Sequence, residues 1–260
     1  MKNIVCLLIV VSTILNMVHG QSVAEESATG IAVVELFTSE GCSSCPPADR
    51  VLMELVSHHN ESGNRVYGLS FHVDYWNRLG WNDPFSHAEF TRRQRVYGEV
   101  FRLTSVYTPQ VVINGTKQMV GSRQWEVVAA VGQALEKPAT ATIQLTTGVG
   151  PEARTLQVGY RVKPFHEHAL LNLALVDVHR SAEVTRGENA GRSLAHANVV
   201  RQFRRVRLPA SGQGSVAVQV PAVNDEISRR VIAYLQSINT AQIFAAAEAD
   251  VQISPDVNPR

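Results

Sequence analysis

Two cysteines with two residues between them are the part of this sequence best suited to chemistry. Cys42 and Cys45 lie in the stretch LFTSEGCSSCPPAD of a 260-residue chain. Cysteines at this spacing can form a reversible disulfide, in which one thiolate attacks and the other resolves, or they can supply soft ligands to a metal. A structural staple is the weaker interpretation, because a bridge that closes so short a loop removes little entropy from the unfolded chain.

The residues around the cysteines predict a turn from a strand into a helix. Residues 31–38 (IAVVELFT) form an apolar, β-branched run of strand length, and residues 48–56 carry apolar side chains at helical spacing behind two prolines. This context places Cys42 just ahead of a helix N-terminus, where unpaired N–H groups and the helix dipole stabilise a thiolate. We therefore expect Cys42 to be the exposed, reactive sulfur and Cys45 to be the more buried, resolving sulfur.

The sequence before residue 138 alternates between strand and helix patterns. After the first strand and helix, it predicts a strand at 65–74, a helix at 86–101, a hairpin formed by 108–114 and 118–120, and an amphipathic helix at 122–137. Beyond residue 138 the pattern changes to short strands at regular spacing. That pattern predicts a β-rich, sandwich-like second domain.

These motifs together resemble the thioredoxin superfamily. The segment Cys42-Ser43-Ser44-Cys45 is similar to its active-site dithiol, and Thr108-Pro109 is similar to its cis-proline loop, which contacts an extended substrate. The stretches FHVDYWNRLGWNDPF and TPQVVING further resemble a family of bacterial exported thioredoxin-like proteins classed as a domain of unknown function. The resemblance implies an α/β thioredoxin-like fold, a central mixed sheet flanked by helices, followed by a β-rich second domain. It implies no particular substrate.

A buried carboxylate is a further expectation from the resemblance. Glu35, in the stretch VELF, is similar to the strand carboxylate with which thioredoxins take the proton of the resolving cysteine. Its spacing to the first cysteine is one residue longer than in that superfamily. The alternative is a strand glutamate that faces solvent.

Polar and aromatic residues follow the second predicted strand, whose carboxyl end opens on the same edge as the cysteine turn. His72 and Asp74 are candidates for proton handling, with a core histidine as the alternative for His72. Trp76 and Trp81 are candidates for the rim of the substrate groove, with packing as the alternative. We assign no metal ligands, since the only histidine pair with ligand spacing, His166 and His168, has no third ligand nearby.

Composition and the amino-terminal residues indicate the class of protein and the compartment in which it works. Hydrophobic residues at 45%, charged residues at 18% and a formal net charge of +1 describe a soluble globular protein without the surface field that nucleic acid or an anionic membrane requires. Residues 1–24 read as a secretory signal peptide, with Lys2 before an apolar run too short to span a bilayer and cleavage after Gly20 or Ala24. We therefore expect a periplasmic or secreted protein with domains at 28–138 and 139–260.

The function expected from these features is thiol–disulfide exchange through the cysteine pair. The substrates would be protein or small-molecule disulfides, and the protein would work with an unidentified redox partner. We expect no organic cofactor and no metal, and no membrane association after the signal peptide is removed. The sequence leaves open whether the pair oxidises, reduces or isomerises. Two alternatives remain: a soft-metal (copper) carrier that uses the same cysteines with His72, and a non-catalytic exported binding protein.

Overall fold

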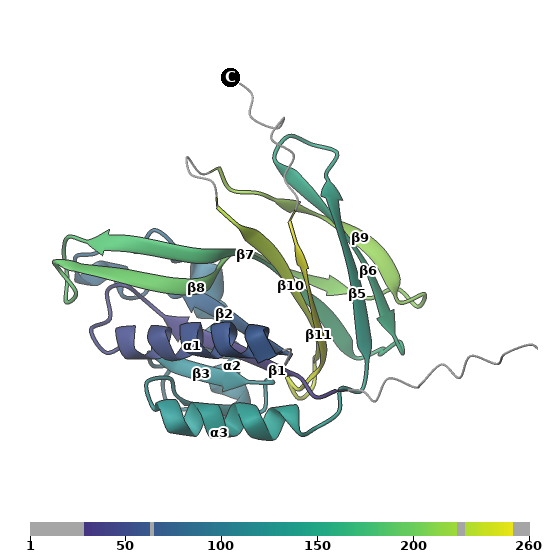
Figure 1. Cartoon of the computed structure of the whole chain (residues 1–260), viewed down its shortest axis with the longest axis horizontal. Helices are drawn as coiled ribbons and strands as arrows, with labels where there is room; N and C mark the ends of the chain where they lie inside the picture. Colours follow the sequence, from purple (N-terminus) through teal and green to yellow (C-terminus); the bar gives the residue numbers. More distant parts are fainter. Residues whose placement is uncertain (1–28, 63–64, 223–226, 252–260) are drawn as a thin grey trace, which may run out of the picture.

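A computed structural model describes residues 29–62, 65–222 and 227–251 (Figure 1). The expected signal peptide at 1–24, with Cys6, lies outside the described residues. Within those ranges, no helix combines the length and the apolar character that crossing a membrane demands.

The part of the chain before residue 138 follows the expected order of strands and helices. The alternating pattern gave this order because each element is specified by local periodicity. Its elements are β1 (Ala32–Thr38), α1 (Pro46–Ser62), β2 (Val66–His72), a short 3-10 helix (Asn77–Leu79), α2 (Ala88–Val100), β3 (Gln110–Ile113), β4 (Lys117–Val120) and α3 (Gln124–Leu135).

The rest of the described chain consists of strands. The sequence predicts short strands here, whereas two of the strands found, β7 and β8, are 16 residues long. The elements are β5 (Thr142–Val149), β6 (Thr155–Lys163), β7 (Ala169–Val184), β8 (Arg192–Arg207), β9 (Gln213–Gln219), β10 (Arg229–Ser237) and β11 (Ile243–Asp250).

One large sheet combines strands from both parts of the chain. Its order is β11-β10-β7-β8-β2-β1-β3-β4, and the two parts join where β2 and β8 run parallel, with Ser70 opposite Val199. A smaller sheet of three strands, β5-β6-β9, packs beside it (Figure 1). The predicted fold, a helix-flanked thioredoxin-like unit followed by a separate β domain, is therefore wrong. The described residues are mostly strand, with three α-helices, and the eight-stranded mixed sheet continues across the expected boundary.

Three apolar cores hold these layers together. The first joins β1 and β2 to α2 and to the C-terminal strands, through residues such as Phe37, Phe71 and Phe203. The second lies between β1, β3 and the helices α1 and α3. The third fills the space between the small sheet and β7, β10 and β11. Because side chains alternate along a strand, neighbouring residues of β1 enter different cores.

A buried disulfide and its polar surroundings

Cys42 and Cys45 form a disulfide at the start of α1. The bond joins residues whose Cα atoms lie 5.4 Å apart, and α1 begins at the next residue, Pro46. The backbone N–H of Cys45 donates to the Cys42 carbonyl at 3.1 Å, and the N–H of Asp49 donates to the Cys45 carbonyl at 3.1 Å. The expected strand, turn and helix around the cysteines are confirmed.

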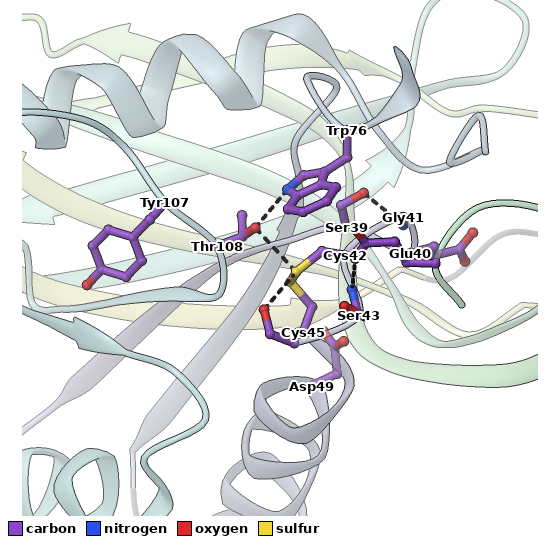
Figure 2. The surroundings of a disulfide bond; sticks show 12 residues. Ser39, Glu40, Gly41, Cys42, Ser43, Cys45, Asp49, Trp76, Tyr107 and Thr108 are labelled. Atoms are coloured by element: carbon purple, nitrogen blue, oxygen red, sulfur yellow. Dashed lines mark hydrogen bonds between the residues drawn. A yellow bond between two sulfur atoms is a disulfide. The ribbon is translucent and has the colours of Figure 1, made fainter. Parts of the chain in front are cut away.

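Two hydroxyl groups contact the Cys42 sulfur. Thr108 donates from its Oγ1 to Cys42 Sγ at 3.3 Å, and Ser44 Oγ lies 3.3 Å from the same sulfur. Trp76 donates from its indole Nε1 to Thr108 Oγ1 at 2.8 Å (Figure 2). The peptide bond between Thr108 and Pro109 is cis. The structure thus brings Thr108 to the Cys42 sulfur and Trp76 to Thr108, and it places Pro109 next to Thr108 in the chain.

Both cysteines are fully buried. Each is 0% exposed, so the expectation of an exposed Cys42 is wrong. The segment that connects β7 to β8 covers the cysteine turn: Glu188 Oε2 accepts from the Ser43 N–H at 3.0 Å, and Asn189 Nδ2 donates to the Cys42 carbonyl at 2.9 Å. Asn189 also donates to the carbonyl of Glu40 at 2.8 Å. No local sequence signal marks Glu188 and Asn189, because they reach the site only through the tertiary fold.

A buried group of acids and histidines lies against the same turn. Its members are Glu40, Asp49, His72, Asp83 and His196, each at most 3% exposed. His72 Nδ1 lies 2.7 Å from Asp83 Oδ2, which also accepts from the Glu40 N–H at 2.9 Å. His196 lies between two carboxylates, 3.5 Å from Glu40 Oε1 and 3.5 Å from Asp49 Oδ1. We call these five residues the polar cluster.

Two carboxylates of the polar cluster raise the pKa of His196. Burial by itself lowers the pKa of His196, but Asp49 and Glu40 on either side outweigh it and raise that pKa to about 10. Burial would raise the pKa of Asp83, but His72 and two backbone N–H groups lower it. His196 is therefore an imidazolium at neutral pH, and Asp83 is ionised.

A family match covers most of the chain. Residues 33–236 match a model described as a protein of unknown function, DUF1223. This chain belongs to the DUF1223 family. The expected resemblance to a family classed as a domain of unknown function is thereby confirmed, while membership of the thioredoxin superfamily is not shown.

One solved structure shares the fold of this DUF1223 chain. An Agrobacterium tumefaciens protein solved by a structural genomics consortium is 23% identical, with a TM-score of 0.62 over 86% of this chain and 98% of that one. A domain of the outer membrane lipoprotein Omp28 from Porphyromonas gingivalis is 6% identical, with a TM-score of 0.28 over 44% of this chain and 89% of that one. No curated protein matches the chain. The first likeness shows the fold alone, and the second is too weak to carry an argument.

Trp81 and Asp74 take different places in the DUF1223 chain. Trp81 donates from Nε1 to Glu40 Oε2 at 2.7 Å, so it contacts the polar cluster rather than the sulfur atoms. Asp74 accepts from Thr91 Oγ1 at 2.5 Å, near the start of α2. The structure therefore brings Trp81 to the site through Glu40, and it holds Asp74 with α2.

Glu35 lies on the other face of the central sheet. Its carboxylate accepts two hydrogen bonds from Arg93, from Nε at 2.8 Å and from Nη2 at 3.0 Å, and further bonds from the hydroxyls of Tyr97 and Tyr234. Its neighbours along β1 enter the core under α1, whereas Glu35 points toward the first core. The structure thus does not bring Glu35 to the cysteines.

The described residues hold no arrangement of three or more His, Cys, Asp or Glu side chains that could bind a metal ion. In particular, the ring of His72 contacts Asp83 rather than the sulfur atoms. The copper-carrier alternative therefore gains no support from the geometry.

Proposed function

We propose that the Cys42–Cys45 pair performs thiol–disulfide exchange. The observation that carries the proposal is the environment of Cys42 Sγ, which two hydroxyl groups, those of Thr108 and Ser44, contact at 3.3 Å. Hydrogen bonds to a thiolate favour its charged form and so make it a better leaving group and nucleophile. A staple needs no such environment, and so short a loop contributes only about 2 kcal/mol in the chain-entropy model.

The exchange conserves atoms and electrons. A substrate thiolate attacks Cys42 Sγ, the bond between the two cysteines breaks, and Cys45 leaves as a thiolate that takes up one proton. The other thiolate of the substrate then attacks the substrate sulfur of the mixed disulfide. This step closes the substrate's disulfide and releases Cys42. Two electrons pass from the substrate dithiol to the protein disulfide, and in the reverse sequence two electrons pass from the protein dithiol to a substrate disulfide, which is reduced. The direction follows from the potential of the pair against its redox partner.

Exchange requires that the cover over the sulfur atoms moves. That cover consists of polar contacts to Glu188 and Asn189 and of the Trp76 indole, rather than of an apolar core. Segments held by a few hydrogen bonds open at a lower free energy than the core does. We infer that a substrate reaches Cys42 when this segment opens.

The compartment and the substrates belong to the same proposal. The signal peptide expected at 1–24 supports a periplasmic or secreted protein, where disulfides form and persist. The substrates are then protein or small-molecule disulfides and dithiols.

Trapping tests the proposed function. In Cys45→Ser, a mixed disulfide at Cys42 cannot be resolved, so covalent adducts that a reductant releases should accumulate in an exporting cell. The matched control is the variant with both Cys42→Ser and Cys45→Ser, which should form none. Absence of adducts from Cys45→Ser, together with a thiol at Cys42 that reacts no faster than a free cysteine, would contradict the proposal.

A further inference from the structure

Asp49 is a buried carboxylate without a hydrogen-bonding partner. It is 3% exposed, and neither of its oxygens accepts a hydrogen bond from the described residues. The nearest charged group to it is the His196 ring at 3.5 Å, which is longer than a usual hydrogen bond between charged groups. A buried carboxylate that accepts no hydrogen bond from the described residues is a candidate for a functional role.

The position of Asp49 relates it to Cys45. The two residues are four apart at the start of α1, so their side chains lie on the same face of the helix, one turn from each other. Figure 2 shows Asp49 below the disulfide, on the first turn of the helix. Asp49 is thus the ionisable side chain of α1 that accompanies the resolving sulfur into the interior.

His196 supplies the charge opposite Asp49. It comes from β8, is 0% exposed, and neither ring nitrogen has a hydrogen bond from the described residues. Its Nδ1 lies 3.5 Å from Asp49 and its Nε2 lies 3.5 Å from Glu40. The His72 ring packs against it with centroids 4.6 Å apart.

Two more charged groups lie around His196. Asp83 approaches from the loop before α2 and contacts His72, and Arg180 is the register partner of His196 on β7. The imidazolium therefore lies between acids from the turn after β1 and from α1, with one histidine from β2 and one arginine from β7 beside it.

Building on the redox function proposed above, we propose that Asp49 exchanges a proton with the Cys45 sulfur and that His196 is a positioning residue, whose ring lies opposite the Asp49 carboxylate. When the disulfide breaks, Cys45 leaves as a thiolate in a dry region, where an unneutralised anion is costly. The proton held between Asp49 and His196 passes to that sulfur. When the disulfide forms again, the Cys45 thiol returns its proton to the pair before it attacks the mixed disulfide. Glu35 cannot serve here, because it lies on the opposite face of the sheet.

A thiolate titration tests this assignment without any substrate. In full-length protein with Cys6→Ser and Cys42→Ser, Cys45 is the only thiol, and its ultraviolet thiolate absorbance against pH gives its titration midpoint. Adding Asp49→Asn removes a neighbouring negative charge and should lower the midpoint by about one pH unit. Adding His196→Gln removes a neighbouring positive charge and should raise the midpoint by about as much.

Glu54→Gln is the matched control. It removes a carboxylate from the same helix at an exposed position, and it should leave the midpoint unchanged. Circular dichroism checks that each variant is folded, and where His196→Gln is not, Asp49→Asn alone decides. A midpoint that Asp49→Asn leaves in place, or that both variants move in the same direction, overturns the assignment.

The two proposals fail in different ways. Adducts trapped by Cys45→Ser with no shift in Asp49→Asn would leave the exchange function standing and remove the role of Asp49. Opposite shifts without any trapped adduct would overturn the exchange function and with it the use of the proton.

Discussion

At the scale of single residues, the chain keeps two buried charge centres on opposite faces of its central sheet. Glu35 and Arg93 lie in the first core, among aromatic rings, with the Arg93 guanidinium 4.8 Å from the centre of the Phe203 ring. Asp49 and His196 lie on the face that α1 covers. In the first centre the carboxylate and the guanidinium are joined by hydrogen bonds, whereas in the second centre the ring nitrogens and the carboxylate oxygens form no hydrogen bond within the described part of the chain. A buried charge whose hydrogen bonds are all formed contributes to stability, whereas one with free hydrogen-bonding atoms can exchange a proton.

Glu35→Gln should therefore affect stability and not chemistry. It leaves the buried Arg93 without its counter-charge, which costs roughly 3–5 kcal/mol when one partner of a buried pair is removed. Urea unfolding should show this loss, whereas the reaction rate of the reduced Cys42 thiol should stay within a factor of two or so of the wild-type rate. Glu54→Gln, at an exposed position, should change the free energy of unfolding by less than about 0.5 kcal/mol. A slower Cys42 with unchanged stability would show that Glu35 acts on the chemistry of the cysteines and not on stability.

His196 should make stability depend on pH at alkaline values. Its folded-state pKa of about 10 lies above its ordinary value of 6.5, so folding favours the protonated ring. The resulting stability is complete below pH 6.5 and is lost as pH rises through 10. The difference in unfolding free energy between wild type and His196→Gln should accordingly be largest near pH 6. It should shrink toward alkaline pH by at most about 1.4 kcal/mol per pH unit. A difference that stays constant over this range would show that His196 is neutral when folded.

At the scale of elements, the hairpin of β7 and β8 does two tasks. Its strands extend the large sheet, and the segment between them reaches over the cysteine turn (Figure 1). Gly187 gives this segment its shape, since it has a φ of +75°, and a Cβ there would lie 3.2 Å from that of Trp81. A long hairpin thus places two polar side chains on a site formed almost 150 residues earlier.

Asn189→Ala should loosen this cover. It removes two hydrogen bonds to the carbonyls of Glu40 and Cys42, each worth about 1 kcal/mol. Reduction of the disulfide by dithiothreitol, which needs an open site, should speed up by about tenfold. Asn239→Ala, at an exposed position in the turn between β10 and β11, is the control and should leave the rate unchanged. An equal rate in all three proteins would mean that the segment does not limit access.

At the scale of the whole molecule, the C-terminal strands complete the core that the N-terminal elements begin. Tyr234 of β10 donates to Glu35 of β1, and Gln236 donates to the hydroxyl of Tyr97 in α2 at 2.9 Å. The backbone of Ile243 donates to the Asn114 carbonyl in the turn between β3 and β4 at 3.0 Å. These contacts make the two parts of the chain depend on each other.

A chain that ends at residue 138 should therefore fail to fold. It would expose the first core and leave Glu35 and Arg93 without Tyr234 and Gln236. We expect no cooperative thermal transition by circular dichroism and rapid proteolysis, in contrast to the full chain. A cooperative transition in this fragment, with the disulfide formed, would show that the first part is an independent domain.

The sequence by itself determined the local features of the site. The cysteine spacing, the run 31–38, the prolines after Cys45 and the Thr108-Pro109 pair each depend on neighbours within a few residues, so periodicity and turn chemistry identify them. For the same reason, the order of strands and helices up to residue 138 could be predicted.

Only the tertiary structure decided how these pieces are used. Three features join residues far apart in the chain: the pairing of β2 with β8, the hydrogen bond from Asn189 to the Cys42 carbonyl, and the ion pair of Asp49 with His196. Strand pairing depends on which surfaces remain to be covered once every element has formed, and arginine-rich β8 carries no pattern that names its partner. Local periodicity therefore predicted the elements of the first part, whereas long-range packing joined them to the C-terminal strands in one continuous sheet.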